Sequence, residues 1–185
     1  EEFMRKLPKN ILLVLDEAYN TFIDVDDFPN GLRYFQKNNL IVLNTFSKAY
    51  GLAGLRIGFA AARPELVSYM ERVRQPFNVN SAAQQGAMAA LDDKKFLAKS
   101  RKTVLEGKND LYRNLKKMGL AYVPSVANFI LVDGGGDGVE CFNRMLKFGV
   151  IVRDMKQYGL KNFIRVTVGT KKENERFVKV LKKIL

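Results

Sequence analysis

Three apolar runs dominate the first sixty residues of the chain. Residues 10–16, 40–45 and 55–61 are each short and nearly continuous in apolar character, and the first ends in an acid, Asp16. Such runs are typical of strands that are buried on both faces of a parallel sheet. Residues 31–37, between the first two runs, suit a short helix. The pattern predicts a β-α-β fragment of an open sheet, where ligands collect beyond the C-terminal ends of the strands.

Beyond residue 63 the apolar spacing becomes helical and then mixed. Pro64 suits the first turn of a helix over 64–75, and a helix-rich segment over 81–118, in which Gly107 could place a bend, ends at Gly119. The remaining expected elements are strands over 121–125 and 128–133, a helix over 139–147, an edge strand over 150–153, a strand over 162–168 and a helix over 173–185.

These elements predict an α/β fold in two parts. Residues 1–80 supply a mostly parallel sheet, and residues 81–185 supply a small α+β domain. A length of 185 residues with 47% hydrophobic content fits this division. The longest apolar stretches fall far short of the roughly 20 residues that a membrane helix needs, so we expect no membrane partner.

Cysteine and histidine usage excludes several kinds of chemistry. Cys141 is the only cysteine, which rules out an internal disulfide or a CxxC motif and suits a buried side chain in a cytoplasmic protein. Histidine is absent, which removes Ser-His-Asp triads, Cys-His pairs and histidine-ligated metals. We expect no metal site.

The net charge of +12 would permit nucleic-acid binding. The lysines, however, are spread through amphipathic stretches such as 94–117 and 171–183, where acids and leucines separate them. We therefore expect solvated helix faces and no nucleic-acid partner. Because the chain does not begin with methionine, we also expect it to be part of a longer protein.

The most informative segment surrounds Lys48. This lysine follows a predicted strand, has Thr45 and Ser47 as hydroxyl neighbours, and precedes Arg56 by eight residues in a glycine-containing stretch. Hydroxyls and a guanidinium together can anchor a phosphate group, and a lysine amine can form an imine. Taken alone, a Ser-Lys pair after a strand is an ordinary surface feature.

A second segment changes that interpretation. Asp16 and Tyr19 follow the neighbouring predicted strand, so they are expected at the same edge of the sheet as Lys48. A carboxylate can keep a pyridine nitrogen protonated, and a phenol can hydrogen-bond a ring oxygen. The two segments together supply the groups that pyridoxal 5′-phosphate (PLP) requires.

These motifs resemble those of the fold-type I aminotransferases, and most closely the histidinol-phosphate aminotransferases. The resemblance rests on Asp16-x-x-Tyr19 and on the block from Ser47-Lys48 to Arg56, and it covers essentially all 185 residues. Four further blocks match in order: Asn78–Gln84, Asn128–Ile130, Gly149–Asp154 and Ile164–Gly169. The implied fold is aspartate-aminotransferase-like, comprising the C-terminal part of the large PLP-binding domain and the small C-terminal domain.

The resemblance also implies roles for individual residues. Lys48 would hold PLP as an imine, Asp16 would pair with its ring nitrogen, and Tyr19 would contact its ring oxygen. The residues implied for its phosphate are Ser47, Arg56 and, more weakly supported, Thr45. Arg165 would bind the substrate carboxylate, and Arg153 a second anion, whereas Asp154 and Tyr158 are expected to be loop residues.

The implied reaction converts L-histidinol phosphate and 2-oxoglutarate to imidazole-acetol phosphate and L-glutamate, in histidine biosynthesis, by a homodimer. The family also has a phosphate loop, a ring-stacking aromatic residue, an asparagine near the ring oxygen and a dimer-crossing tyrosine, none of which has a counterpart here. Three alternatives remain: a PLP-dependent decarboxylase of a phosphorylated amino acid, an aminotransferase for another amino acid, and an inactive fragment with an exposed apolar face.

Overall fold

A computed structural model describes residues 2–36 and 39–185 of the chain. The chain divides into two compact units, Glu1–Ala98 and Lys99–Leu185. The sequence-based boundary at residue 80 concerns the large and small domains of the resembled family and stays a prediction. Each unit is described below by itself.

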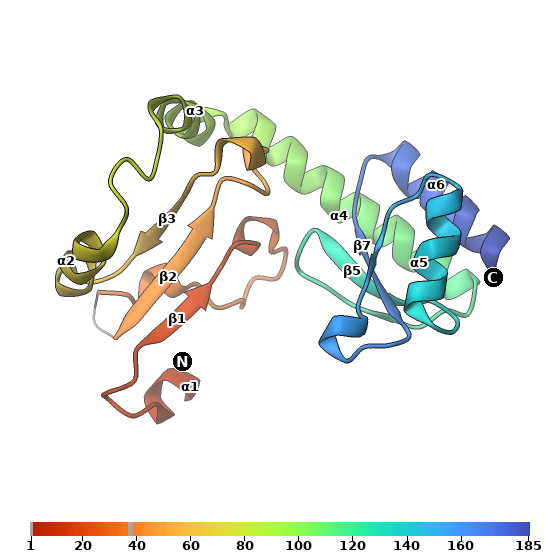
Figure 1. The fold of residues 1–185 in the computed structure, drawn as a ribbon, viewed down its shortest axis with the longest axis horizontal. Coiled ribbons are helices and arrows are strands. Elements are labelled where there is room, and N and C mark those ends of the chain that lie inside the picture. The colour runs from red at the N-terminus through yellow and green to blue at the C-terminus, as the bar shows by residue number, and fades with distance from the viewer. Residues whose placement is uncertain (1, 37–38) are drawn as a thin grey trace. The chain divides into compact units, whose positions relative to one another are not determined.

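The first unit is built on a three-stranded sheet in the order β1-β2-β3 (Figure 1). Its strands are β1 (Leu13–Asp16), β2 (Leu40–Thr45) and β3 (Gly58–Ala61), and its helices are α1 (Glu2–Lys6), α2 (Pro64–Val73) and α3 (Ser81–Asp92). β1 pairs with β2 in parallel, and β2 pairs with β3 antiparallel. The central strand β2 carries the core, because Leu40 and Val42 are fully buried. The α/β class is as expected, and one of the two strand pairings is parallel.

Two segments of this unit differ from the predicted secondary structure in the region before α2. Residues 31–36 form a 3-10 turn, Gly31–Arg33, followed by turns instead of a helix, and Lys37 lies outside the described residues. The buried Gly31 opens this segment with low helix propensity, and its amide is held by the Glu17 carboxylate at 2.6 Å. The third predicted strand starts only at Gly58, because Ala53–Leu55 is another 3-10 turn.

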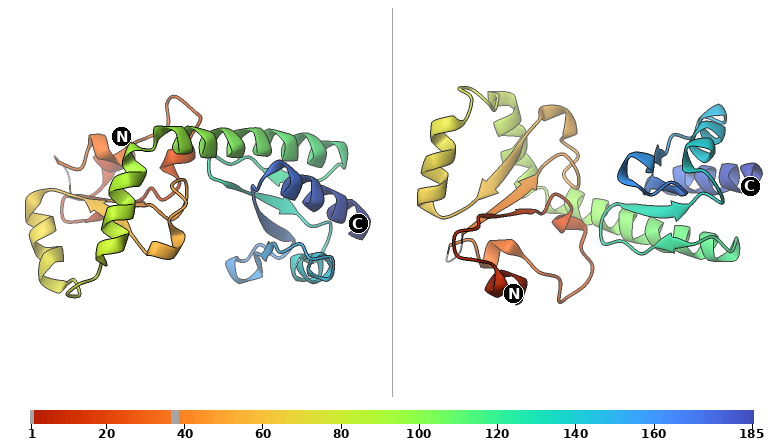
Figure 2. Two further views of the ribbon diagram at one scale, coloured as in Figure 1. Left: turned by 90° about the horizontal axis from the view of Figure 1, so that it is seen from above. Right: turned by 60° about the horizontal axis from the view of Figure 1, so that its bottom comes forward.

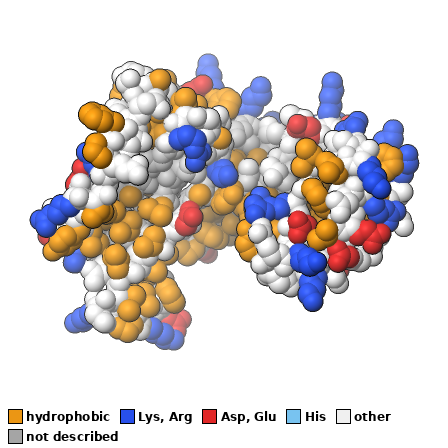
Figure 3. Space-filling model, in the orientation of Figure 1, with side chains coloured by type: hydrophobic (Ala, Val, Ile, Leu, Met, Phe, Trp, Pro, Cys, Tyr) orange, Lys and Arg blue, Asp and Glu red, His pale blue; other side chains and the backbone are white. Residues whose placement is uncertain are grey.

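Strand β1 is less buried than its apolar sequence predicts. Its burial alternates along the strand, and Val14 is 50% exposed, as are Ile11 and Leu12 to a similar extent. Within the described residues only β2 pairs with β1, so one edge and one face of β1 stay open. Figure 3 shows hydrophobic side chains gathered over this part of the first unit. The expectation of a strand buried on both faces is therefore wrong for β1.

The helical segment over 81–118 breaks at Asp93 and not at Gly107. Asp93 ends α3 by donating its amide to Ala89 O, and its carboxylate accepts from the Phe96 amide at 2.9 Å to cap α4 (Lys94–Lys117). Aspartate is a preferred N-cap because its oxygen satisfies a free amide of the first turn. Figure 2 shows α4 continuing beyond this break as one helix, without an interruption at Gly107.

The second unit is an antiparallel α+β layer with sheet order β4-β5-β7-β6. Its elements after α4 are β4 (Tyr122–Val123), β5 (Phe129–Asp133), α5 (Gly138–Lys147), β6 (Arg153–Asp154), β7 (Phe163–Thr167) and α6 (Lys171–Ile184). Burial alternates along β5 and β7, so Ile130, Val132, Ile164 and Val166 point into the core with the apolar sides of the helices. The opposite face of the sheet carries Arg165. The predicted α+β texture and an edge strand in this region are confirmed. The strand is Arg153–Asp154 and not residues 150–153, so the expectation that Asp154 is a loop residue was wrong.

Cys141 lies inside this unit, in α5, and is buried as expected. Burial raises the pKa of its thiol above the ordinary value, and the nearby Arg144 opposes this effect. Cys141 therefore stays a neutral thiol at physiological pH. None of the helices in the described ranges is both long enough and apolar enough to cross a membrane.

Candidate active site

Three strand ends meet at one edge of the first sheet. β1 and β2 are parallel, with Asp16 opposite Leu43, so their C-terminal ends lie together. β3 runs antiparallel to β2 and begins where β2 ends, with Gly58 opposite Thr45. A Cβ at Gly58 would meet the Asn44 carbonyl oxygen at 2.6 Å, so only glycine permits this close approach. The segments that follow β1, follow β2 and precede β3 are thereby collected at one place.

A hollow of about 300 Å³ opens at this edge. The residues that line it are Asp16, Ala18, Leu43, Asn44, Thr45, Ser47, Lys48 and Arg56. Five of the six predicted cofactor residues are thus brought together. The sixth, Tyr19, is not part of the lining, but its ring centroid lies 5.5 Å from Lys48 Nζ.

The loop that carries Lys48 is closed by backbone hydrogen bonds. The Phe46 amide donates to Ile57 O at 3.2 Å, and the Leu52 amide donates to Phe46 O at 3.0 Å. Gly51 has a φ of 72° and donates its amide to Lys48 O, which makes a tight turn directly after the lysine. These bonds give Lys48 a fixed backbone position although its side chain is exposed.

Arg56 lies at the other end of this loop in a left-handed conformation. Its φ is 55° and its ψ is 48°, values that cost a residue with a Cβ about 1–2 kcal/mol. One guanidinium nitrogen donates to Ala53 O at 2.9 Å. Arg56 is also one of the residues that line the hollow. Strain of this kind is frequent at functional positions, where the surrounding structure enforces it.

Short side-chain contacts order the remaining lining. Thr45 Oγ1 accepts from the Ser47 amide at 3.0 Å, and Asp16 Oδ1 accepts from the Ala18 amide at 3.0 Å. The hollow therefore combines one amine, one carboxylate, two hydroxyls and one guanidinium. Such a set can hold a phosphate at one end and a protonated ring nitrogen at the other.

Two residues that the sequence did not reveal support this site. Glu17 accepts from the Gly31 amide at 2.6 Å and from the Asn20 side chain at 2.7 Å, which fixes the segment between Asp16 and Tyr19. Asn44 lines the hollow and accepts from the Thr45 amide at 3.0 Å. Neither contact has a sequence signal, because each depends on how the loops are folded.

The two predicted substrate arginines belong to the second unit. Arg153 of β6 and Arg165 of β7 are direct register partners, so both side chains leave the same face of the sheet. The Arg165 guanidinium carbon lies 5.1 Å from the Phe129 ring centroid. The structure therefore brings these two predicted residues together.

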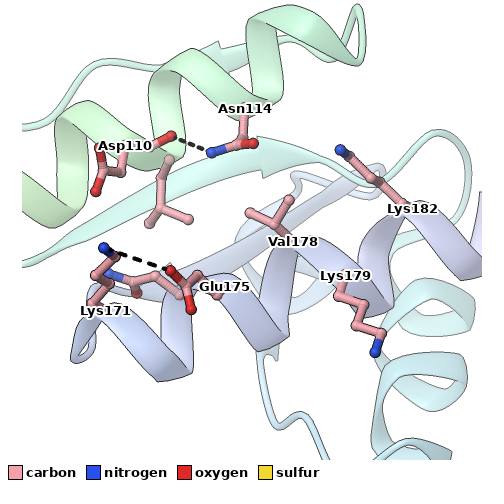
Figure 4. Close-up of a pocket in the computed structure, with 9 residues that line it drawn as sticks. Asp110, Asn114, Lys171, Glu175, Val178, Lys179 and Lys182 are labelled. Carbon is pink, nitrogen blue, oxygen red and sulfur yellow. Dashed lines mark hydrogen bonds and ion pairs between the residues drawn. The ribbon is translucent and has the colours of Figure 1, made fainter.

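Another pocket of about 350 Å³ lies between α4 and α6 (Figure 4). Asp110 and Asn114 face it from α4, and Lys171 and Glu175 face it from α6. Lys171 Nζ lies 4.0 Å from Glu175 Oε1. Its charged rim carries both signs over an apolar floor that includes Val178. Neither an amine beside a phosphate anchor nor any predicted site residue occurs in its lining, so it is not the candidate site.

Comparisons with known proteins agree with the geometry. Residues 1–181 match the family described as aminotransferase class I and II. The chain is 47% identical to histidinol-phosphate aminotransferase of Moorella thermoacetica over 99% of its own length and 48% of the relative's. It is 46% identical to histidinol-phosphate aminotransferase 2 of Carboxydothermus hydrogenoformans, over 100% of its own length and 52% of the relative's.

A solved structure shows the same fold. The histidinol-phosphate aminotransferase of Sinorhizobium meliloti, in complex with pyridoxal-5′-phosphate, is 29% identical with a TM-score of 0.81. The match covers 100% of this chain and 52% of that one. The chain thus spans about half the length of the curated relatives that it matches.

Proposed function

The chain belongs to the aminotransferase class I and II family, and from this premise we propose that it carries the cofactor-holding lysine, Lys48, of a PLP-dependent transaminase. The observation that carries the proposal is the single hollow that Lys48 shares with Asp16, Thr45, Ser47 and Arg56. The amine suits the aldehyde of PLP, the carboxylate suits its ring nitrogen, and the hydroxyls and guanidinium together suit its phosphate. When bound, PLP supplies an electron sink for negative charge at the substrate carbon.

Each residue of the hollow then has a defined task. Lys48 Nζ would hold the cofactor covalently and, as a free amine, would carry a proton between the substrate α-carbon and the cofactor. The Asp16 carboxylate would accept the hydrogen bond of the ring nitrogen and keep that nitrogen protonated. The Tyr19 hydroxyl would hydrogen-bond the ring oxygen. The phosphate would be held by the Ser47 and Thr45 hydroxyls and the Arg56 guanidinium.

The arginine pair supports the choice of substrate. We propose that the parent reaction transfers the amino group of L-histidinol phosphate to 2-oxoglutarate, giving imidazole-acetol phosphate and L-glutamate, in histidine biosynthesis. The two substrates would use the Arg153 and Arg165 guanidinia in turn, one through its phosphate and the other through its carboxylates. The names of the relatives at 47% and 46% identity favour this substrate. The family resemblance supports a homodimer, and it supports a location in the cytoplasm.

Borohydride reduction in the presence of PLP tests the cofactor assignment. The treatment fixes PLP permanently to the amine that holds it, and peptide mapping then identifies that amine. We expect label at Lys48 in the whole protein and its loss in Lys48→Arg, which keeps the charge but cannot attach the cofactor. Label spread equally over many lysines in both proteins would overturn the assignment.

Product analysis tests the reaction. The whole protein with L-histidinol phosphate and 2-oxoglutarate should release glutamate without carbon dioxide. Release of carbon dioxide from a phosphorylated amino acid would identify a decarboxylase instead. Transamination of other amino acids with no turnover of histidinol phosphate would retain the reaction type but reject the substrate.

A further inference from the structure

Two positively charged side chains lie opposite each other on β6 and β7, the last two strands of the second sheet. Arg153 and Arg165 are register partners on antiparallel strands, a position at which like charges repel. Among the ion pairs of residues 2–36 and 39–185, none involves either guanidinium. The arrangement is therefore electrostatically unfavourable, and a bound anion would relieve the repulsion.

Aromatic rings hold both guanidinia in place. The Arg165 guanidinium carbon lies 5.1 Å from the Phe129 ring centroid, and that of Arg153 lies 5.6 Å from the Tyr158 ring centroid. Arg153 Nη2 also donates to Tyr158 Oη at 3.2 Å. A cation beside an aromatic face is stabilised by about 0.5–1 kcal/mol at an exposed site. The two rings restrict guanidinia that would otherwise move freely.

A tight turn holds the backbone of Tyr158. Tyr158 ends a 3-10 turn, Lys156–Tyr158, that is closed by Gly159 with a φ of 79°. Its amide donates to the carbonyl oxygen of Met155 at 3.0 Å, and the Met155 side chain is buried. Tyr158 itself is 57% exposed, so burial of its own ring does not explain its position.

We propose that Tyr158 is a positioning residue that orients Arg153 and makes the arginine pair selective for a phosphate monoester. This inference rests on the proposed function. Because Tyr158 Oη accepts a hydrogen bond from Arg153, its own hydrogen remains available to a further acceptor. A phosphate monoester offers three acceptor oxygens to the two guanidinia and this hydroxyl, whereas a carboxylate offers two. Loss of the hydroxyl should therefore weaken phosphate recognition more than carboxylate recognition.

The test compares Tyr158→Phe with the unaltered whole protein. We expect KM for L-histidinol phosphate to rise about 10-fold, with kcat and KM for 2-oxoglutarate changed less than about 2-fold. Tyr158→Leu, which also removes the ring, should raise the same KM further. Equal effects on both substrates, or no effect on either, would overturn the proposal.

Tyr69→Phe is the matched control. Tyr69 is 62% exposed, and the Arg72 guanidinium carbon lies 5.3 Å from its ring centroid, but the pair belongs to α2 in the first unit. This variant should leave every kinetic constant unchanged. A KM increase in Tyr69→Phe equal to that in Tyr158→Phe would overturn the proposal.

Titration with inorganic phosphate gives a readout that does not require turnover. Calorimetry should show about 10-fold weaker phosphate binding in Tyr158→Phe, and Arg153→Met should abolish the same binding event. If the protein transfers no amino group but this weakening is seen, the proposed function fails while the anion-positioning role stands. If transamination is normal and phosphate binding is unchanged in Tyr158→Phe, the positioning role fails.

Discussion

The Lys48 ammonium nitrogen lies 5.5 Å from the centroid of the Tyr19 ring. This contact joins the loop that follows β2 to the segment that follows β1. The two residues are 29 positions apart in the sequence. The Tyr19 ring and hydroxyl therefore have separable tasks, since the ring contacts the lysine and the hydroxyl is assigned to the cofactor.

Tyr19→Phe should separate these tasks. Because the ring stays beside Lys48, borohydride should still label Lys48. Loss of the hydroxyl should weaken PLP binding about 3-fold to 10-fold, as expected for one hydrogen bond. Absorbance titration with PLP measures the affinity. Movement of the label to other lysines in Tyr19→Phe would contradict this assignment.

Arg56→Gly should uncouple stability from cofactor binding. Glycine removes the left-handed strain of about 1–2 kcal/mol, and its greater freedom in the unfolded state costs about 0.5–1 kcal/mol. We expect the free energy of unfolding to stay constant or rise by up to about 1.5 kcal/mol, while PLP affinity falls steeply. Urea unfolding and PLP titration measure the two quantities.

Phe77→Gly is the control for this experiment. Phe77 has the same φ of 55° and lies outside the lining of the hollow. Phe77→Gly should leave the free energy of unfolding constant or raise it, as Arg56→Gly does, and it should leave PLP affinity unaltered. Equal loss of PLP affinity in both variants would indicate a general loss of structure.

Gly107→Ala should destabilise the protein although alanine favours a helix. A Cβ at Gly107 would meet Val168 Cγ1 at 2.5 Å and Asn174 Nδ2 at 2.7 Å. The overpacking costs about 1–3 kcal/mol, which exceeds the helix-propensity gain of about 1 kcal/mol. Gly86→Ala in α3 is the comparison, because its Cβ would meet only the mobile ends of leucine side chains. Urea unfolding should give Gly107→Ala a lower free energy of unfolding than Gly86→Ala. The reverse order would reject this packing argument.

The capping box of α6 should make stability depend on pH. The hydrogen bond from the Thr170 side chain, and next that from the Thr170 amide, lower the pKa of Glu173 from 4.5. Because the folded-state pKa lies below the unfolded one, this stabilisation is complete above about pH 4.5 and is lost as the pH falls through the lowered value. Thr170→Ala should cost about 1 kcal/mol at pH 7 and less at pH 3, measured by urea unfolding.

Glu175→Gln is the control for the capping box. Its carboxylate oxygen Oε1 forms an exposed ion pair with Lys171 Nζ at 4.0 Å, which contributes at most about 0.5 kcal/mol. It should change stability at pH 7 by no more than that amount. A Thr170→Ala penalty that is the same at pH 3 and pH 7 would contradict the role of the Glu173 carboxylate.

Most elements of the fold could be predicted from the sequence, and so could the candidate site. The Lys48 block and Asp16-x-x-Tyr19 identified the family, since closely spaced residues of a specific type suffice for that step. Short apolar runs located β2 and β5, because such runs between turn residues are typical of buried strands. The break at Asp93 was missed because helix-favouring residues continue on both sides of it, although aspartate is a preferred N-cap.

Local sequence patterns report each segment's preference for helix or strand and for burial, and they determined the family, the element types and the candidate residues. Only the tertiary structure decided that β3 runs antiparallel and delivers Arg56 to the hollow, that Glu17 anchors Gly31, and that Arg153 stands opposite Arg165 beside Tyr158. Strand direction, register and side-chain contacts depend on partners that are distant along the chain. The spacing of neighbouring residues carries no direct record of them.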